Sequence, residues 1–426
     1  MLAFKIKLLL SVIAFILVID IYSWQAFRTL IRDKSQSFRL WVRRGYFGIT
    51  VFTIVMFLLF NLSTSIETNA TFRYYFMAAT FVLYFPKFIT MIFLLIDDAI
   101  RAVRWAIKTS TSMIRHTPVK QDVEEGGSSK ISRAKFLSQT GAIAGAVPFV
   151  VLSKGIIRGA YDYQVHRVPL YLKNLPFAFE GLKVVQLSDI HTGSLFDKDS
   201  VHRGIQMAMA EKPDLVFFTG DLVNSETKEA YDLMDHFAQI KAPMGVHSIF
   251  GNHDYGDYRT WDSPADKAKN LEDLVKVHRD MGWNLLRNEH VLLEKGGQQI
   301  ALIGVENWGD KGRFQKFGDI EKATKGLQDV PVQLLLSHDP SHFDSVVTKN
   351  HPEIDAMFAG HTHGFQFGIE NAFIKWSPSK YIYPRWAGLY REENQQIYVN
   401  RGYGFLGYPG RIGILPEITV FELRRA

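Results

Sequence analysis

The chain has 426 residues, of which 47 % are apolar and none is cysteine. Without cysteine, disulfides, zinc–thiolate sites, thiol catalysis and iron–sulfur clusters are excluded, so a metal would need His, Asp, Glu, Asn or water as ligands. Residues 1–135 hold 18 basic and 8 acidic residues, whereas the remainder holds 31 and 35. A basic pI can indicate nucleic-acid binding, but the excess of basic residues lies in residues 1–135 and not in the remainder of the chain. We therefore expect no nucleic-acid partner.

Three apolar stretches near the N-terminus are long enough to cross a membrane as helices, at about residues 6–26, 46–65 and 72–96. Their length and their lack of a polar face argue against a buried helical core. The third stretch contains Pro86, which typically kinks a membrane helix. It also contains Lys87, whose charge either reaches water or a partner, or has a function of its own. Residues 1–100 are therefore predicted to form a transmembrane region.

Basic residues beside these stretches predict their orientation. Residues 28–44 carry six basic residues and one acidic residue, and residues 101–120 carry five basic residues. Because basic loops remain in the cytoplasm, both segments are expected there, with the N-terminus outside. Residues 101–135 would then form a basic cytoplasmic linker, in which 121–130 has the composition of a flexible segment.

The segment 136–159 leaves two alternatives open. Residues 132–137 resemble a twin-arginine export signal in which Ala134 replaces the second arginine, and an apolar run follows from Gly141 to Ile157. The segment is either a fourth span or an amphipathic segment on the cytoplasmic face. A fourth span, the favoured alternative, would place residues 160–426 on the external or periplasmic face of a bacterial-type cell membrane.

Residues 160–426 contain short apolar runs of strand length that end in polar residues. The runs at 182–187, 215–218, 246–250, 332–336 and 356–359 precede, in that order, Asp189 with His191, Asp221, Asn252 to Asp254, His338, and His361 with His363. Helical segments are predicted between several of them, at 201–211, 228–239 and 264–281. Continuous apolar strands with intervening helices indicate an α/β fold whose sites form at the carboxyl ends of the strands. One such ending is ordinary turn chemistry, but five in order indicate metal binding.

These motifs resemble those of the calcineurin-like metallophosphoesterase superfamily. They are Asp189-x-His191, Gly220-Asp221, Gly251-Asn252-His253-Asp254, His338 and Gly360-His361-x-His363, within roughly residues 180–426. The late residues 398–402 and Arg411 are similar to those of the membrane-associated phosphodiesterase branch of the YkuE and YaeI type. The resemblance implies a four-layer αββα sandwich over residues 160–426, preceded by the helical transmembrane region.

The resemblance also implies the role of each site residue. One divalent metal would be held by Asp189, His191 and His363, a second by Asn252, His338 and His361, and Asp221 would bridge both. His253 would be catalytic, facing the substrate as a general acid or as a donor to developing charge. Nitrogen and oxygen ligands suit Mn, Fe or Zn without choosing among them. Two such ions clamp a phosphoryl group.

The implied activity is hydrolysis of phosphodiester or pyrophosphate bonds by a membrane-anchored enzyme with two metals. Its anchor favours a lipid-linked or cell-envelope substrate, as for UDP-2,3-diacylglucosamine hydrolase-like enzymes of similar families. The alternatives are a phosphomonoesterase and a non-catalytic membrane binding protein with the same fold. Eight aromatic residues between Phe365 and Tyr390 form either a flap that admits an acyl chain or ordinary core packing. No protein partner is predicted.

Overall fold

The computed structural model describes residues 2–62, 70–115, 133–312, 314–327 and 330–426. The chain divides into two compact units, Met1–Ser153 and Lys154–Ala426. Residues 121–130, predicted to be a flexible segment, lie outside the described residues.

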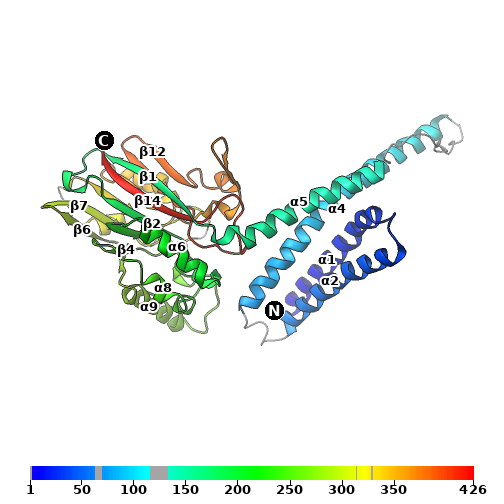
Figure 1. Cartoon of the computed structure of the whole chain (residues 1–426), viewed down its shortest axis with the longest axis horizontal. Coiled ribbons are helices and arrows are strands. Elements are labelled where there is room, and N and C mark those ends of the chain that lie inside the picture. Colours follow the sequence, from blue (N-terminus) through cyan, green and yellow to red (C-terminus); the bar gives the residue numbers. More distant parts are fainter. Residues whose placement is uncertain (1, 63–69, 116–132, 313, 328–329) are drawn as a thin grey trace. The chain divides into compact units, whose positions relative to one another are not determined.

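The first unit contains the apolar helices expected from the sequence, except for the last turn of α5 (Figure 1). The bounds are Leu2–Leu30 for α1, Gln36–Leu62 for α2, Ala70–Arg115 for α4 and Arg133–Ile157 for α5. In the part of the chain that the structure describes, four segments are long and apolar enough to cross a membrane: Leu9–Leu30, Gln36–Phe60, Tyr74–Thr111 and Gln139–Tyr161. The described residues of all three predicted spans are helical, and α5, which covers most of the segment 136–159, is long and apolar enough to be a fourth span.

Helix α4 is longer than the sequence predicted. It continues through Pro86 and past residue 96 to Arg115, a length of 46 residues. At 1.5 Å per residue this is about 69 Å, more than twice the thickness of the hydrocarbon layer. The apolar run stops at the acidic residue Asp97, but the helix does not, because Asp97 pairs with Arg101 one turn later at 3.0 Å. Residues 101–115, assigned to the basic linker, are therefore helical.

Lys87 has a buried partner within the helical unit. Its Nζ lies 2.6 Å from Oδ1 of Asp20 and between the rings of Tyr46 and Tyr84, at 4.4 and 4.5 Å from their centroids. Asp20 also accepts hydrogen bonds from the hydroxyls of Thr50, at 2.5 Å, and Tyr84, at 3.0 Å. Of the alternatives for Lys87, the structure shows the one in which its charge is paired.

Small residues bring α5 against α4. The Thr90 hydroxyl of α4 donates to the carbonyl of Gly141 at 3.0 Å. A Cβ added at Gly145, one turn later, would lie 2.3 Å from the Thr90 hydroxyl and 2.7 Å from the Pro86 carbonyl. Small residues four positions apart allow this close approach of two membrane helices.

The second unit is a sandwich of two mixed six-stranded sheets (Figure 1). The first sheet has the order β1-β14-β2-β3-β4-β5, with bounds Gln164–Leu172, Glu417–Arg425, Lys183–Leu187, Leu215–Phe218, Val246–Ser248 and Asn284–Leu285. The second has the order β12-β13-β9-β8-β7-β6, with bounds Gly388–Glu392, Gln395–Val399, Ala356–Ala359, Gln333–Leu336, Gln298–Gly304 and Glu289–Lys295. A short pair, β10 (Ile369–Glu370) and β11 (Lys375–Trp376), lies apart from both.

Successive residues of the central strands show why the unit has four layers. Phe217 of β3 faces the sandwich interior, where its ring lies 5.0 Å from that of Phe358 on β9. The next residue, Phe218, faces the opposite way, 6.0 Å from the His278 ring of α9 (Pro264–Asp280). In the second sheet, Leu335 of β8 packs with the cluster that includes Phe343 outside the sheets. Both sheets are thus buried on two faces, and the expected αββα architecture is confirmed.

Several elements differ from the sequence-based expectation. The helix expected at 228–239 is two short helices, α7 (Lys228–Tyr231) and α8 (Met234–Phe237). The helix expected at 201–211 begins earlier, as α6 (Lys198–Ala210). Strands β1, β6 and β12 were not predicted. They pair with a neighbour on only one side, and the exposed positions that this allows interrupt their apolar pattern.

Candidate metal centre

The predicted site residues lie in loops that leave both sheets at one edge of the sandwich. Strands β2, β3 and β4 are parallel neighbours, and so are β8 and β9. Their carboxyl ends therefore lie together, which brings residues separated by up to 172 positions into contact. The first sheet supplies Asp189, Asp221 and Asn252, and the second supplies His338, His361 and His363.

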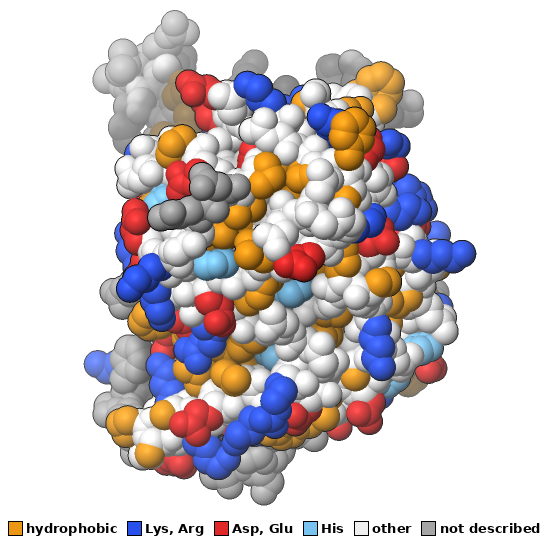
Figure 2. Space-filling view, turned by 90° about the vertical axis from the view of Figure 1, so that its left-hand side faces the viewer, with side chains coloured by type: hydrophobic (Ala, Val, Ile, Leu, Met, Phe, Trp, Pro, Cys, Tyr) orange, Lys and Arg blue, Asp and Glu red, His pale blue; other side chains and the backbone are white. Residues whose placement is uncertain are grey.

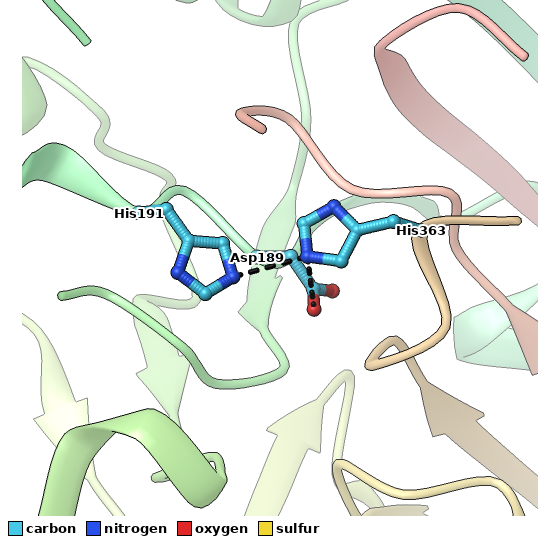
Figure 3. Close-up of side chains that lie close together, drawn as sticks. All are labelled: Asp189, His191 and His363. Carbon is cyan, nitrogen blue, oxygen red and sulfur yellow. Dashed lines mark hydrogen bonds and ion pairs between the residues drawn. The ribbon is translucent and has the colours of Figure 1, made fainter. Parts of the chain in front are cut away.

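Three of these residues form a compact buried group (Figure 3). The ligand atoms of Asp189, His191 and His363 all lie within 4.8 Å of one another. Nε2 of His191 is 3.0 Å from Nε2 of His363, and the latter is 3.3 Å from Oδ1 of Asp189. Figure 3 shows a ring nitrogen of His191 directed at a ring nitrogen of His363, which in turn contacts the carboxylate of Asp189. This is the trio expected for the first metal.

Asp221 lies where the first group meets a second. Ligand atoms of Asp189, Asp221 and His338 form another buried set within 4.8 Å. Oδ2 of Asp221 is 3.2 Å from Nε2 of His338 and 3.6 Å from Nε2 of His191. A carboxylate in contact with members of both groups has the position that a bridging ligand requires.

Asn252 and His361 form a contact beside His338. Oδ1 of Asn252 accepts a hydrogen bond from Nδ1 of His361 at 2.7 Å, and the rings of His361 and His338 lie 5.2 Å apart. Nε2 of His361 contacts the Tyr383 hydroxyl at 2.8 Å. In this arrangement the oxygen of Asn252 is directed at His361 and not at Asp221. The residues expected for the second metal are thus adjacent, but less convergent than the first trio.

His253 is placed differently from the buried histidines His191, His338 and His363. Its ring is half-buried, lies edge-to-face with His191 at 4.9 Å and stacks on Tyr258 at 4.1 Å. Its Nδ1 donates to the carbonyl of Asn224 at 2.6 Å. Because Nδ1 carries that proton, Nε2 is the nitrogen left to meet a substrate.

Backbone strain is concentrated at the predicted ligands. Asp189, His191, Asp221, His361 and His363 have φ of 51°, 51°, 60°, 72° and 48°. Non-glycine residues in this left-handed region cost of order 1–3 kcal/mol each, although Asp and His adopt it more readily than most. Such strain persists only where neighbouring contacts fix the loop, and it typically accompanies functional sites.

The carboxylate of Asp254 supplies much of that fixation. It is fully buried and accepts backbone N–H groups from Gly251 at 2.8 Å and from Asp221 and Leu222 at 2.9 Å each. A Cβ added at Gly251 would lie 2.2 Å from Oδ1 of Asp221, so only glycine allows the two loops to approach this closely. Asp254 thereby holds the loops of β3 and β4 together.

Burial controls the charge of the histidines. It lowers the pKa of His191 to about 3 and that of His363 well below its usual range, so both rings are neutral at pH 7. Burial also lowers the pKa of His338, but the adjacent carboxylate of Asp221 outweighs it and raises the pKa to about 10. Burial raises the pKa of Asp189 to about 6. Neutral imidazole is the form that binds a metal, and a dication at Asp221 would compete with the proton of His338.

The donor set fits divalent metal ions. Nε2 of His338 is buried and lies 3.2 Å from Oδ2 of Asp221, and Nε2 of His191 is 3.0 Å from Nε2 of His363. Nitrogen and oxygen lone pairs directed at one another in this way could be accepted by a metal ion. Imidazole nitrogens with carboxylate and amide oxygens suit Mn, Fe or Zn. Asp189, His191, Asp221, His338 and His363 are the residues whose geometry best supports metal binding.

Three residues outside the predicted ligand set also contact this centre. Tyr258 stacks on His253, and its hydroxyl oxygen accepts a hydrogen bond from the side-chain amide of Asn252 at 2.6 Å. Tyr383 bonds His361, and Arg411 approaches Nδ1 of His363 at 3.1 Å. Only Arg411 belonged to a motif that the sequence singled out. The two tyrosines follow no motif, and only folding brings them to the centre.

The aromatic segment from Phe365 to Tyr390 divides into two sets. Tyr383 and Trp386 are buried with Ala387 and Ile414 in a small core. In contrast, Phe373 is 96 % exposed and Tyr381 is 73 % exposed. Ordinary core packing therefore accounts for Tyr383 and Trp386, but not for Phe373 and Tyr381.

Comparison with known proteins agrees with this architecture. Residues 6–160 match the family described as "Probable Calcineurin-like phosphoesterase, transmembrane domain", and residues 182–365 match "Calcineurin-like phosphoesterase". "Transmembrane protein with metallophosphoesterase domain" from Danio rerio is 30 % identical over 280 residues, which cover 64 % of this chain and 60 % of that protein. "Uncharacterized metallophosphoesterase YkuE" from Bacillus subtilis is 29 % identical over 314 residues, which cover 69 % of this chain and 98 % of that protein.

The sandwich, with a cluster of histidines and aspartates that could hold metal ions, is the fold of a calcineurin-like phosphoesterase domain, and helices long and apolar enough to cross a membrane precede it in the chain. The chain belongs to the calcineurin-like phosphoesterases, and the resemblance inferred from the five motifs is confirmed. The matched part of the chain spans less than two thirds of the zebrafish relative and almost all of the Bacillus relative.

Proposed function

We propose that the protein is a membrane-anchored phosphoesterase that uses two divalent metal ions to hydrolyse phosphodiester or pyrophosphate bonds. The observation that carries the proposal is the position of Asp221, whose Oδ2 lies 3.2 Å from His338 and 3.6 Å from His191. Asp189, His191 and His363 would hold one ion, and Asn252, His338 and His361 the other. The ions would stabilise charge on the phosphoryl oxygens and activate water for attack.

His253 is proposed to deliver a proton to the leaving group. The hydrogen bond from its Nδ1 to Asn224 orients the ring, and stacking on Tyr258 fixes its plane. The cationic ring would release the proton from Nε2 to the departing oxygen and return to the neutral form that keeps the Nδ1 proton. Its half-buried position beside His191 supports contact with substrate.

A lipid-linked or cell-envelope substrate is supported by the exposed apolar side chains that follow His363. Phe365, Phe367, Phe373, Tyr381 and Ile382 are all exposed, within the segment that also supplies Tyr383. Exposed aromatic side chains of this kind favour the interface of a membrane. Figure 2 shows one face of the molecule, on which acidic, basic and hydrophobic side chains are interspersed.

The domain is proposed to lie on the external face of the membrane. The basic segments at 28–44 and 101–120 would face the cytoplasm, and α5 would then return the chain to the outside. A phosphatase reporter fused after Tyr163 tests this orientation, because it is active only outside the cytoplasm.

Turnover by the purified full-length protein tests the activity. The protein would be stripped of metal, supplied with Mn²⁺ and assayed on an aryl phosphodiester and the matching monoester. We expect metal-dependent diester cleavage that falls by about 10²–10⁴ in His253→Ala and is abolished in Asp221→Asn. Metal-loaded protein that cleaves neither substrate would overturn the proposal.

The substrate class has a separate test. The variant Phe373→Ser/Tyr381→Ser removes exposed aromatic surface without altering the metal residues. It should cleave the soluble diester like the parent and lose turnover on a phosphodiester lipid presented in vesicles. Equal effects on both substrates would contradict the lipid-linked substrate while leaving the phosphoesterase activity intact.

A further inference from the structure

The helical unit contains a second polar site, at the facing ends of α1 and α2. A hollow of ≈ 1160 Å³ lies between the last turns of α1 and the first turns of α2. Its polar lining includes Arg28 and Arg32 from α1, and Arg39 and Arg43 from α2. No acidic residue is among the residues described as lining it. The hollow thus combines the size of a ligand site with an excess of four positive charges.

The spacing of the arginines explains why all four face one hollow. Arg28 and Arg32 are four positions apart, as are Arg39 and Arg43, so each pair occupies one face of its helix. Other cations of the same segment do not share this placement. Lys34 does not line the hollow, and Arg44 lies over the ring of Trp41 at 5.7 Å. Orientation of the membrane helices requires basic residues here, but it does not require them to converge.

Among the residues that the structure describes, none forms an ion pair or a side-chain hydrogen bond with the guanidinium groups of Arg28, Arg32, Arg39 and Arg43. By contrast, Arg101 of α4 pairs with Asp97 at 3.0 Å. Four like charges around one hollow repel one another, and an anion between them would relieve that repulsion.

The remaining lining of the hollow is apolar. Ile21, Trp24, Leu40 and Phe47 contribute to it, and the rings of Trp24 and Phe47 are 5.5 Å apart. Arg28 lies near the end of the candidate span Leu9–Leu30, and Arg39 and Arg43 near the start of Gln36–Phe60. The hollow is therefore at the edge of the spans, where lipid headgroups meet hydrocarbon.

We propose that this hollow binds the phosphate headgroup of an anionic phospholipid, with its acyl chains along the apolar lining. Arginine forks match phosphate oxygens in geometry as well as charge. Basic pockets between membrane helices on the cytoplasmic side are suited to such headgroups. The site is independent of the metal centre and of the proposed hydrolysis.

Lipid binding by the full-length protein tests the proposal. The protein would be purified in detergent and titrated with phosphatidylglycerol or phosphatidylcholine, and bound lipid would be counted by native mass spectrometry at 0.15 M salt. The double variant Arg28→Gln/Arg39→Gln removes one arginine from each helix. Its matched control, Lys34→Gln/Arg44→Gln, removes the same charge from the same segment outside the hollow.

We expect the parent to prefer phosphatidylglycerol and the first variant to bind it about 25-fold more weakly, since each arginine contributes about fivefold. The control should lose at most about threefold, because cations outside the hollow are screened by salt. Equal losses in both variants would show that charge alone matters and would overturn the site. Inorganic phosphate that binds the parent as tightly as phosphatidylglycerol does would overturn the assignment to a lipid.

A second measurement keeps the proposal testable if the variants fold poorly. The unmodified protein would be crosslinked to a photoreactive phosphatidylglycerol, and the labelled peptides would be mapped. Labelling concentrated in residues 21–47 supports the site. Labelling spread evenly over the helices would refute it.

Discussion

The role of Asp254 gives the most direct test of how the metal loops are held. Replacement by asparagine keeps the shape of the side chain but puts an NH₂ group where one carboxylate oxygen stood. Each oxygen accepts at least one backbone N–H at 2.8 to 2.9 Å: Oδ2 from Gly251 and Asp221, and Oδ1 from Leu222. At least one of these bonds must break, and the new donor then faces an N–H group.

The magnitude follows from the number of bonds. Hydrogen bonds to a charged group contribute about 1.5–3 kcal/mol each. Loss of one or two, partly offset by the smaller cost of burying a neutral amide, should destabilise the protein by about 2–4 kcal/mol. For a unit of this size that corresponds to a fall in Tm of about 5–15 °C. Because the same loops carry Asp221 and Asn252, Mn²⁺ should also bind more weakly.

Thermal unfolding in detergent, followed by tryptophan fluorescence, measures the change in Tm, and titration calorimetry measures Mn²⁺ affinity. Asp235→Asn is a matched control, since Asp235 is exposed on α8 and should melt like the parent. If Asp254→Asn melted within about 1 °C of the parent and bound Mn²⁺ equally well, the carboxylate would not be what fixes these loops.

Three further predictions concern pH, the membrane region and the metal. Burial lowers the pKa of His278 to about 3. Below pH 6.5 this histidine therefore binds a proton in the unfolded chain but stays neutral in the folded chain. The contribution of His278 to the free energy of unfolding is therefore fully present above pH 6.5 and falls by up to about 1.4 kcal/mol per pH unit toward pH 3. His278→Gln should reduce this dependence on pH in melts recorded from pH 7 to 5. Lys87→Met leaves Asp20 buried without its counter-ion and should cost about 3–5 kcal/mol in detergent unfolding, which Asp20→Asn should partly restore; an unchanged midpoint in Lys87→Met would contradict the buried pair. Mn²⁺ at 100 times its Kd should stabilise the stripped protein by about 2.7 kcal/mol, and EDTA should reverse the shift, whereas Asp221→Asn should show neither effect.

The strands that carry the site could be predicted because their apolar runs are continuous. Strands β3 and β9 coincide with the predicted runs at 215–218 and 356–359. Edge strand β1 escaped prediction because its burial alternates and its sequence includes His166 and Arg167. A strand exposed on one side has no continuous apolar pattern to detect.

Contacts between residues far apart in the chain are a second feature that the sequence could not predict. Lys87 stood out in the sequence, but Asp20 lies 67 positions away inside the first apolar run, and nothing local links the two. The extension of α4 was missed for a related reason, since hydropathy reports where a membrane span ends and not where a helix ends. Tyr258 and Tyr383 reach the metal centre through loop geometry, which motif spacing does not encode.

The residues of the candidate metal centre come from both sheets, so its geometry depends on how the two sheets are aligned. Asp189 and His191 follow one sheet and His363 follows the other, so a small slide between the sheets would separate the trio before it disturbed either sheet. The aromatic contact of Phe217 with Phe358 at 5.0 Å resists such a slide from inside the sandwich. A bound ion would resist the slide from the edge of the sandwich, because it would crosslink two sheets that are otherwise joined mainly by hydrophobic packing.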